Sequence, residues 1–230
     1  MADTADDLLQ AFPVSLRPEA EATVRLLQDH LRPSVHSPGE KDSHLIEVSV
    51  AGEAVAIPYR LYDGDHTRIH YSEKPFHRLT DLLIGQSLSG RQQRMAFCLL
   101  SRHHNGFVRE AALCRIAAAP DVFVVPFVAQ LASEYVYEIL LQIGLRLPEL
   151  DTKTYGAFFR DNPLDFNRLR QRMISYWNCY YRWHDYASAD GELRHHWRDR
   201  YVGFDIFDAF EAMARTDSFR LPDNSVPVKP

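Results

Sequence analysis

One glutamate pair and one glutamate–histidine pair have the spacing that metal chemistry on helices requires. Glu134 and Glu138 lie four residues apart, and Glu192 and His195 lie three apart. On a helix these offsets place both members of a pair on one face. Carboxylate and imidazole groups from packed helices are the ligands of di-iron and di-manganese bundles. The four residues therefore define one hypothesis, a helical metal-dependent enzyme.

Three further histidines, His66, His70 and His77, lie close together in a polar segment. Imidazole groups can bind zinc, but no cysteine or carboxylate with ligand spacing accompanies these three. The Gly85-Gln-Ser87-Leu-Ser-Gly90 run misses the spacing of a nucleophile elbow by one residue. No other motif requires a cofactor, so the sequence predicts none.

Adjacent histidines also occur at His103 and His104, between two arginines, Arg102 and Arg109. If this segment is the turn of a helical hairpin, it can present imidazole and guanidinium groups to an anion or an acidic partner. A structural role is the alternative, with Arg109 linking neighbouring units of the fold.

Aromatic residues are dense between Ser175 and Trp183, and arginines flank them. Such a mixture can stack on nucleic-acid bases. It is also typical of the residues that dominate protein interfaces. Because residues adjacent around a helix cannot all face one ligand, we expect some of these rings in the core. The rest, with Tyr181 and Trp183 as candidates, would form a protein-binding patch.

The composition limits the classes of function. The chain has 230 residues, 46% of them hydrophobic, and a formal net charge of -5. No global basic field attracts it to phosphate backbones, so a nucleic-acid partner is not expected. The sequence shows no secretory signal and no apolar run long enough to span a bilayer, and we expect a cytoplasmic protein without membrane contact. Cys98, Cys114 and Cys179 lie in apolar helical patterns, which predicts buried reduced thiols.

The first 80 residues are expected to hold a helix, a β-hairpin and a long loop. The apolar pattern predicts the helix from about Arg17 to Leu31. Alternating apolar residues over 46–50 and 55–59, separated by Ala51-Gly52-Glu53, predict the hairpin. The polar stretch 62–80 is the loop.

Residues 81–220 are expected to form a helical domain, followed by a tail over 221–230. Ser89 and Asn105 have the character of N-caps for two successive helices. A third helix is expected from Pro120 or Pro126 to about Leu145, with polar positions every four residues at Gln130, Glu134 and Glu138. Further helices are expected at 152–160, 163–184, 192–201 and 204–215.

The segment Asn105-Gly-Phe-Val-Arg-Glu-Ala-Ala-Leu113 resembles the second helix of a HEAT repeat. Asn105, Val108, Arg109, Ala112 and Leu113 fill that pattern. The resemblance covers about residues 94–147 and implies a helical scaffold that serves as a binding surface more often than as an enzyme.

These observations predict a mainly α fold, a compact multi-helix, HEAT-like domain with a small N-terminal β-hairpin. The leading functional hypothesis is a non-catalytic adaptor, regulator or neutralising partner that binds another protein. The metal-dependent enzyme and a nucleic-acid-binding protein remain alternatives. The residues predicted to contact the protein partner are Arg102, His103, His104, Arg109, Gln130, Glu134, Glu138, Tyr181 and Trp183.

Overall fold

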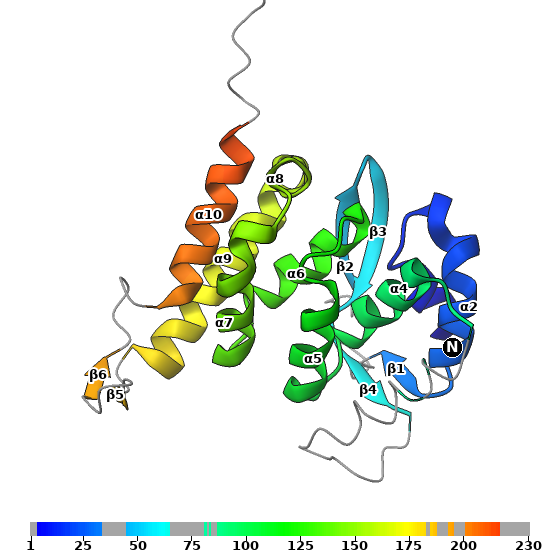
Figure 1. Cartoon of the computed structure of the whole chain (residues 1–230), viewed down its shortest axis with the longest axis horizontal. Helices are drawn as coiled ribbons and strands as arrows, with labels where there is room; N and C mark the ends of the chain where they lie inside the picture. Colours follow the sequence, from blue (N-terminus) through cyan, green and yellow to red (C-terminus); the bar gives the residue numbers. More distant parts are fainter. Residues whose placement is uncertain are drawn as a thin grey trace, which may run out of the picture.

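The protein is mainly α-helical in a computed structural model that describes residues 4–33, 45–64, 81, 83, 87–182, 185–187, 193–195 and 201–216. Short strands accompany the helices near the N-terminus, as the sequence predicted. The N-terminal elements, the hairpin and α4 lie at one end of the molecule, and α7 to α10 lie at the other, with α5 and α6 between them (Figure 1). A continuous apolar core runs through both ends.

The N-terminal elements are α1 (Thr4–Leu9), η1 (Val14–Leu16), α2 (Arg17–Leu27), β1 (Leu31–Pro33), β2 (Leu45–Val50), β3 (Glu53–Pro58) and β4 (Leu61–Asp63). The predicted helix and hairpin are present, but the helix ends at Leu27 and not near Leu31, and α1 and the paired strands β1 and β4 were not predicted. Strands β2 and β3 form the predicted antiparallel hairpin. Its turn residues Ala51 and Gly52 both have positive φ, 52° and 82°, as the favoured two-residue hairpin turns require.

Each outer edge of this hairpin is hydrogen-bonded to another part of the chain at one residue. The backbone N–H of Ala56 on β3 donates to the carbonyl oxygen of Gln10, at 2.8 Å. On β2, the N–H of Ser49 donates to Oδ1 of Asn162, and Nδ2 of Asn162 donates back to the Ser49 carbonyl oxygen, at 2.7 and 2.8 Å. These bonds satisfy groups that an edge strand would leave open.

Strand β4 positions the turn between α4 (Gly90–Leu100) and α5 (Gly106–Ile116). The N–H of Leu61 donates to the Arg102 carbonyl oxygen, and the His104 N–H donates to the Leu61 carbonyl oxygen. The predicted caps of both helices are confirmed. Ser89 and Gln92 form a capping box, and the Asn105 side chain accepts from the Phe107 N–H.

The single helix expected up to about Leu145 is wrong. After η2 (Val122–Val124), the chain forms α6 (Val125–Leu131), leaves helical geometry over 132–136, and starts again as α7 (Tyr137–Arg146). The Gln130 carbonyl oxygen accepts from both the hydroxyl and the backbone N–H of Ser133, at 2.9 and 3.3 Å, so a side chain adds a bond at the helix end. The break changes which way the polar residues of this segment point.

The C-terminal elements are η3 (Leu147–Glu149), α8 (Thr152–Asp161), α9 (Pro163–Tyr176), the π-helical turn η4 (Trp177–Tyr181), β5 (Asp185–Ala187), β6 (Leu193–His195) and α10 (Val202–Thr216). Among them, α10 packs against α7 and α8. The helix expected over 192–201 is wrong at 193–195, which pair with β5 as a strand. None of the helices in the described part of the chain has the length and apolar composition that crossing a bilayer requires.

The cysteine prediction holds for one residue of the three. Cys98 is buried, whereas Cys114 and Cys179 are exposed, and all three are free thiols. Cys114 faces outward because it lies on the solvent side of α5, and Cys179 because it lies in η4.

A glycine allows α8 and α10 to approach closely. A Cβ atom at Gly156 would overlap the backbone carbonyl oxygen of Met213, whereas a Cβ atom at Gly90 would have no neighbour nearer than 3.5 Å. We therefore expect Gly156→Ala to lower the free energy of unfolding by about 2 kcal/mol or more, because backbone cannot move aside cheaply. Gly90→Ala should cost nothing. Urea denaturation of both variants checks this, and equal stability would contradict the close approach.

Candidate functional site

The carboxylate of Glu134 lies at the centre of a buried arginine cluster. Its Oε2 is 2.7 Å from Nη2 of Arg60 and 3.5 Å from Nη2 of Arg109, and its Oε1 is 3.9 Å from Nη1 of Arg102. Arg102, Arg109 and Glu134 are all at least 97% buried. One carboxylate, from the break between α6 and α7, is therefore shared by three guanidinium groups. Arg60 directly precedes β4, Arg102 lies in the α4–α5 turn, and Arg109 lies on α5.

Two of these arginines also hold the backbone around them. Nε and Nη2 of Arg102 donate to the carbonyl oxygens of Pro58 and Tyr59. Nη1 of Arg109 donates to the carbonyl oxygens of His103 and His104. Arg109 therefore has a structural role: its guanidinium group binds the backbone of the turn that precedes its own helix.

The cluster has more donors than acceptors. Among the described residues, Nη1 of Arg60, Nη1 of Arg102, and Nε and Nη2 of Arg109 are buried without a hydrogen-bond partner. Nη1 of Arg102 and Nη2 of Arg109 are within ion-pair distance of Glu134 but make no hydrogen bond to it. Three guanidinium groups thus share one carboxylate. The cluster therefore holds an excess of positive charge that its own carboxylate does not balance.

The pKa values reflect this imbalance. Burial raises the pKa of Glu134, but the charges of Arg60 and Arg109 outweigh it and hold that pKa at about 2. Burial, together with the neighbouring charge of Arg60, lowers the pKa of Arg102 to about 9. Burial also lowers the pKa of Arg60, yet Glu134 outweighs it and raises the net value above the ordinary one. Glu134 is ionised at neutral pH.

A second set of polar residues extends the cluster toward α9. Nη2 of Arg172 donates to Oε1 of Gln130 at 2.9 Å, and Nε of Arg172 donates to Oγ of Ser133 at 2.9 Å. Nε2 of Gln130 in turn donates to Oδ2 of Asp165 at 3.3 Å. Burial raises the pKa of Asp165, and its Oδ1 lies 3.9 Å from Nη1 of Arg168. Gln130 is 99% buried, so it is a link inside the fold.

The expected outer stripe of polar residues at 130, 134 and 138 is therefore wrong. Gln130 and Glu134 point inward, and only Glu138 is exposed. The helix break is the reason, since the chain leaves α6 in order to place Glu134 among the arginines. Four of the predicted contact residues, Arg102, His103, Arg109 and Glu134, do come together, but they are buried.

Tyrosines cover the outer side of this region. The rings of Tyr135, Tyr176 and Tyr180 lie 5.8, 6.1 and 6.0 Å apart pairwise, and we call these three residues the tyrosine cluster. Tyr135 is 45% exposed and Tyr180 is 53% exposed. Tyr59 lies nearby, with the guanidinium carbons of Arg60 and Arg172 at 5.5 and 5.8 Å from its ring centre.

The aromatic segment places no described side chain fully in the core: Trp177 and Tyr181 are half-buried and pack against it, whereas Tyr180 is exposed. Tyr176 and Tyr180, four residues apart, join Tyr135 on the outside. Trp177 packs on Phe204, with ring centres 5.1 Å apart. Tyr181 contacts the ring of Tyr201, and its hydroxyl donates to the Tyr135 carbonyl oxygen. Tyr181 is thus a support for Tyr135, and Trp183 lies outside the described residues.

Asp63 binds both histidines of the α4–α5 turn. Its Oδ1 is 3.3 Å from Nε2 of His103, and its Oδ2 is 3.4 Å from Nε2 of His104. These hydrogen bonds hold the pKa of Asp63 well below its usual range. Burial lowers the pKa of His103, more than Asp63 raises it. His103 is therefore neutral at neutral pH.

Asp63, His103 and His104 are also close enough together to hold a metal ion. Their possible ligand atoms all lie within 4.8 Å of one another, and no other such group occurs among the described residues. The hydrogen bonds do not suit that role. Nδ1 of His103 accepts from the Asn105 N–H at 3.1 Å, which assigns the imidazole proton to Nε2. Nε2 then donates to Asp63 and has no lone pair for a metal. The group serves as a clamp between β4 and the α4–α5 turn.

The predicted helical metal site is not assembled by the described residues. Glu134 is surrounded by arginines, and Glu138 lies exposed on α7. His195 ends strand β6, and Glu192 lies outside the described residues, as do His66, His70 and His77. The helical spacing proposed for Glu192 and His195 does not apply to a strand.

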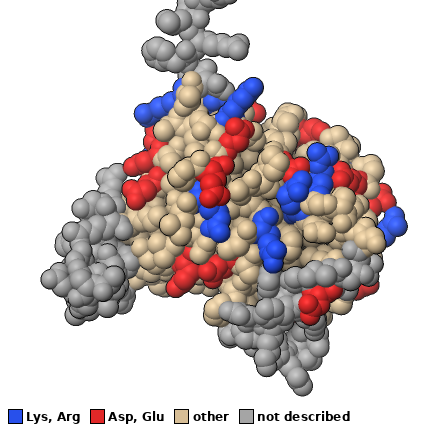
Figure 2. Space-filling view, viewed as in Figure 1, with Lys and Arg blue, Asp and Glu red and all other residues tan. Residues whose placement is uncertain are grey.

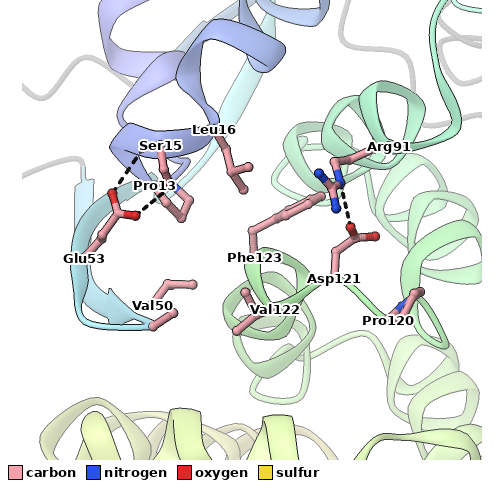
Figure 3. Close-up of a pocket in the computed structure, with 11 residues that line it drawn as sticks. Pro13, Ser15, Leu16, Val50, Glu53, Arg91, Pro120, Asp121, Val122 and Phe123 are labelled. Carbon is pink, nitrogen blue, oxygen red and sulfur yellow. Dashed lines mark hydrogen bonds and ion pairs between the residues drawn. The ribbon is translucent and has the colours of Figure 1, made fainter.

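A separate cavity of about 510 Å³ lies between η1, the hairpin turn and the start of η2. In Figure 3 the side chains of Leu16, Val122 and Phe123 border its centre, with the Ser15–Glu53 hydrogen bonds on one side and the Arg91–Asp121 ion pair on the other. Its size and apolar lining suit a small ligand. Glu53 accepts hydrogen bonds from Ser15, and Arg91 pairs with Asp121.

Several residues of the site were not predicted from the sequence. They are Tyr59, Arg60, Asp63, Tyr135, Arg172 and Tyr176. The one usable signal was the aromatic-arginine segment, which contains Arg172 and Tyr176. Comparisons with protein-family models, with curated proteins and with solved structures find no match.

Glu134→Gln tests the central carboxylate. At neutral pH we expect a loss of roughly 3–5 kcal/mol in the free energy of unfolding, because the variant leaves buried guanidinium groups without a counter-ion. The contribution of the wild-type carboxylate is complete above about pH 4.5 and is lost as the pH falls towards about 2. The difference between the two proteins should therefore shrink over that range.

Urea denaturation at a series of pH values measures this. Glu21→Gln is the control, because Glu21 forms an exposed i,i+4 pair with Arg25 and surface pairs contribute little. An acid profile that is the same for wild type and Glu134→Gln would contradict the role of Glu134.

Proposed function

We propose that this protein is a non-catalytic protein-binding module and that the tyrosine cluster forms the centre of its binding surface. The carrying observation is the gathering of Tyr135, Tyr176 and Tyr180 on the outside, with two of them about half exposed. Tyrosine and arginine are enriched among the residues that dominate binding energy in protein interfaces. A tyrosine offers a large rigid contact area and one hydrogen-bonding hydroxyl.

The setting of the cluster supports this proposal. Tyr180 lies in the π-helical turn η4, and π-helical turns occur frequently at functional sites. Tyr135 lies in the α6–α7 break, and its backbone carbonyl oxygen accepts a hydrogen bond from the Tyr181 hydroxyl. Rigid support reduces the entropy that a side chain loses on binding. The tyrosines are therefore presented by a surface that is already ordered.

The buried arginine cluster would act as the foundation of this surface. Its members fix β4, the α4–α5 turn and the α6–α7 break relative to one another. The predicted residues Arg102, His103, Arg109, Gln130 and Glu134 enter the proposal in this supporting role. The HEAT-like resemblance of the α4–α5 hairpin favours the same class of function, and we retain it as part of the proposal.

We place the protein in the cytoplasm as an adaptor, regulator or neutralising partner. Two exposed free cysteines suit a reducing compartment. A nucleic-acid partner has less support, because Lys and Arg side chains are interspersed with Asp and Glu on the face drawn in Figure 2, and the net charge of the chain is -5. A polynucleotide-binding groove would need basic residues along its length.

Affinity capture from the native cell, followed by mass spectrometry, tests the proposal. We expect a partner to be retained by wild type and reduced by about tenfold or more with Tyr135→Ala or Tyr180→Ala, since hot-spot truncations cost about 2 kcal/mol or more. Leu145→Ala is the control, because Leu145 on α7 is 73% exposed and lies outside the cluster. Unchanged capture by both tyrosine variants would refute the proposed surface.

A further inference from the structure

We infer that the partner bound at the tyrosine cluster is a protein segment rich in Asp and Glu. This inference rests on the proposed function and specifies the chemistry of the partner. It is drawn from the excess of guanidinium groups behind the cluster, from the two arginines that contact Tyr59, and from the contrast between this local charge and the charge of the whole chain.

The charge excess follows from the residues of one hydrogen-bonded network. It contains four arginines, Arg60, Arg102, Arg109 and Arg172, and two acidic side chains, Glu134 and Asp165. Asp165 also lies 3.9 Å from the exposed Arg168, and even with both carboxylates ionised the four arginines outnumber them by two. At least two positive charges therefore remain without compensation.

This charge acts on the surface above it. The interior screens a charge less than water does, so an uncompensated buried charge projects a potential through the side chains that cover it. Arg60 and Arg172 both lie against the ring of Tyr59. Arg172 lies four residues before Tyr176 on the same face of α9, and it also bonds Ser133, two residues before Tyr135. The positive potential therefore emerges at the tyrosine cluster.

The tyrosine hydroxyls supply direct contacts for carboxylates. Each hydroxyl can donate one hydrogen bond, and burial raises the pKa of Tyr176, so that hydroxyl stays protonated at neutral pH. Arg172 is half-buried and uses Nε and Nη2 inside the protein. The orphaned donors of Arg60, Arg102 and Arg109 are enclosed, and they contribute through their field and not by contact.

The net charge of the chain makes this surface selective. At -5, the protein as a whole repels an acidic partner. A positive potential confined to one aromatic surface therefore directs such a partner to one place and one orientation. Basic partners would meet the opposite pattern, since the acidic residues elsewhere attract them and the tyrosine cluster does not.

Fluorescence anisotropy with defined probes tests the inference on the full chain. The probes are fluorescein-labelled oligoglutamate, oligolysine and oligothymidylate of equal length. We expect oligoglutamate to bind at low salt and its affinity to fall as salt rises. Arg172→Gln and Tyr135→Ala should each weaken this binding about tenfold, which is about 1.4 kcal/mol. Arg25→Gln is the matched control, because it removes one equal charge from an exposed site on α2.

A second measurement avoids any dependence on the folding of variants. In the wild-type protein, Nε of Arg172 is held by Ser133, so its N–H should give a resolved NMR signal. Oligoglutamate should shift that signal and leave the exposed Arg25 signal unchanged. Arg172→Lys identifies the resonance.

Three outcomes would overturn the inference. They are no oligoglutamate binding at low salt, equal weakening by Arg172→Gln and Arg25→Gln, and tighter binding of oligothymidylate or oligolysine than of oligoglutamate. If tyrosine-dependent capture from cells persists in any of these cases, the proposed binding surface stands and only its acidic partner is refuted. If the tyrosine variants lose no captured protein, the proposed function itself fails.

Discussion

The Glu134 carboxylate and the arginines around it are the constraint that organises the centre of this fold. A carboxylate taken out of water needs cations close by, and it finds them on Arg60, Arg102 and Arg109. Those arginines come from three different parts of the chain. Reaching them requires the chain to leave α6 and restart as α7. Tyr135, the next residue, is thereby turned to the outside.

The same arrangement connects the interior to the surface. Arg102 and Arg109 use part of their guanidinium groups on backbone carbonyl oxygens and so join the hairpin region to the α4–α5 turn. The Asp63 clamp reinforces that junction from the other side through His103 and His104. Most of the charged and polar residues that the sequence suggested as an exposed site are therefore buried and hold the fold together. The side chains exposed above them are tyrosines.

Features determined by neighbouring residues were predictable from the sequence. The capping box at Ser89, the Asn105 cap and the β2–β3 hairpin depend on contacts within a few residues, and the structure contains all three. The α6–α7 break could not be predicted, because the sequence Leu131-Ala132-Ser133-Glu134 contains no strong helix breaker. Burial of Arg102 and Arg109 depends on partners more than 20 residues away, and a single sequence does not show such pairings.

Closure of the hairpin by Asn162 has a consequence for the order in which the chain folds. Ser49 and Asn162 are separated by 113 positions. During synthesis the outer edge of β2 is therefore present long before Asn162, its hydrogen-bonding partner. Contacts between distant residues must also overcome a large loss of chain entropy before they form. The hairpin can therefore gain its final shape only late, when the junction of α8 and α9 arrives. Until that moment the nascent chain carries an open strand that other nascent chains could join.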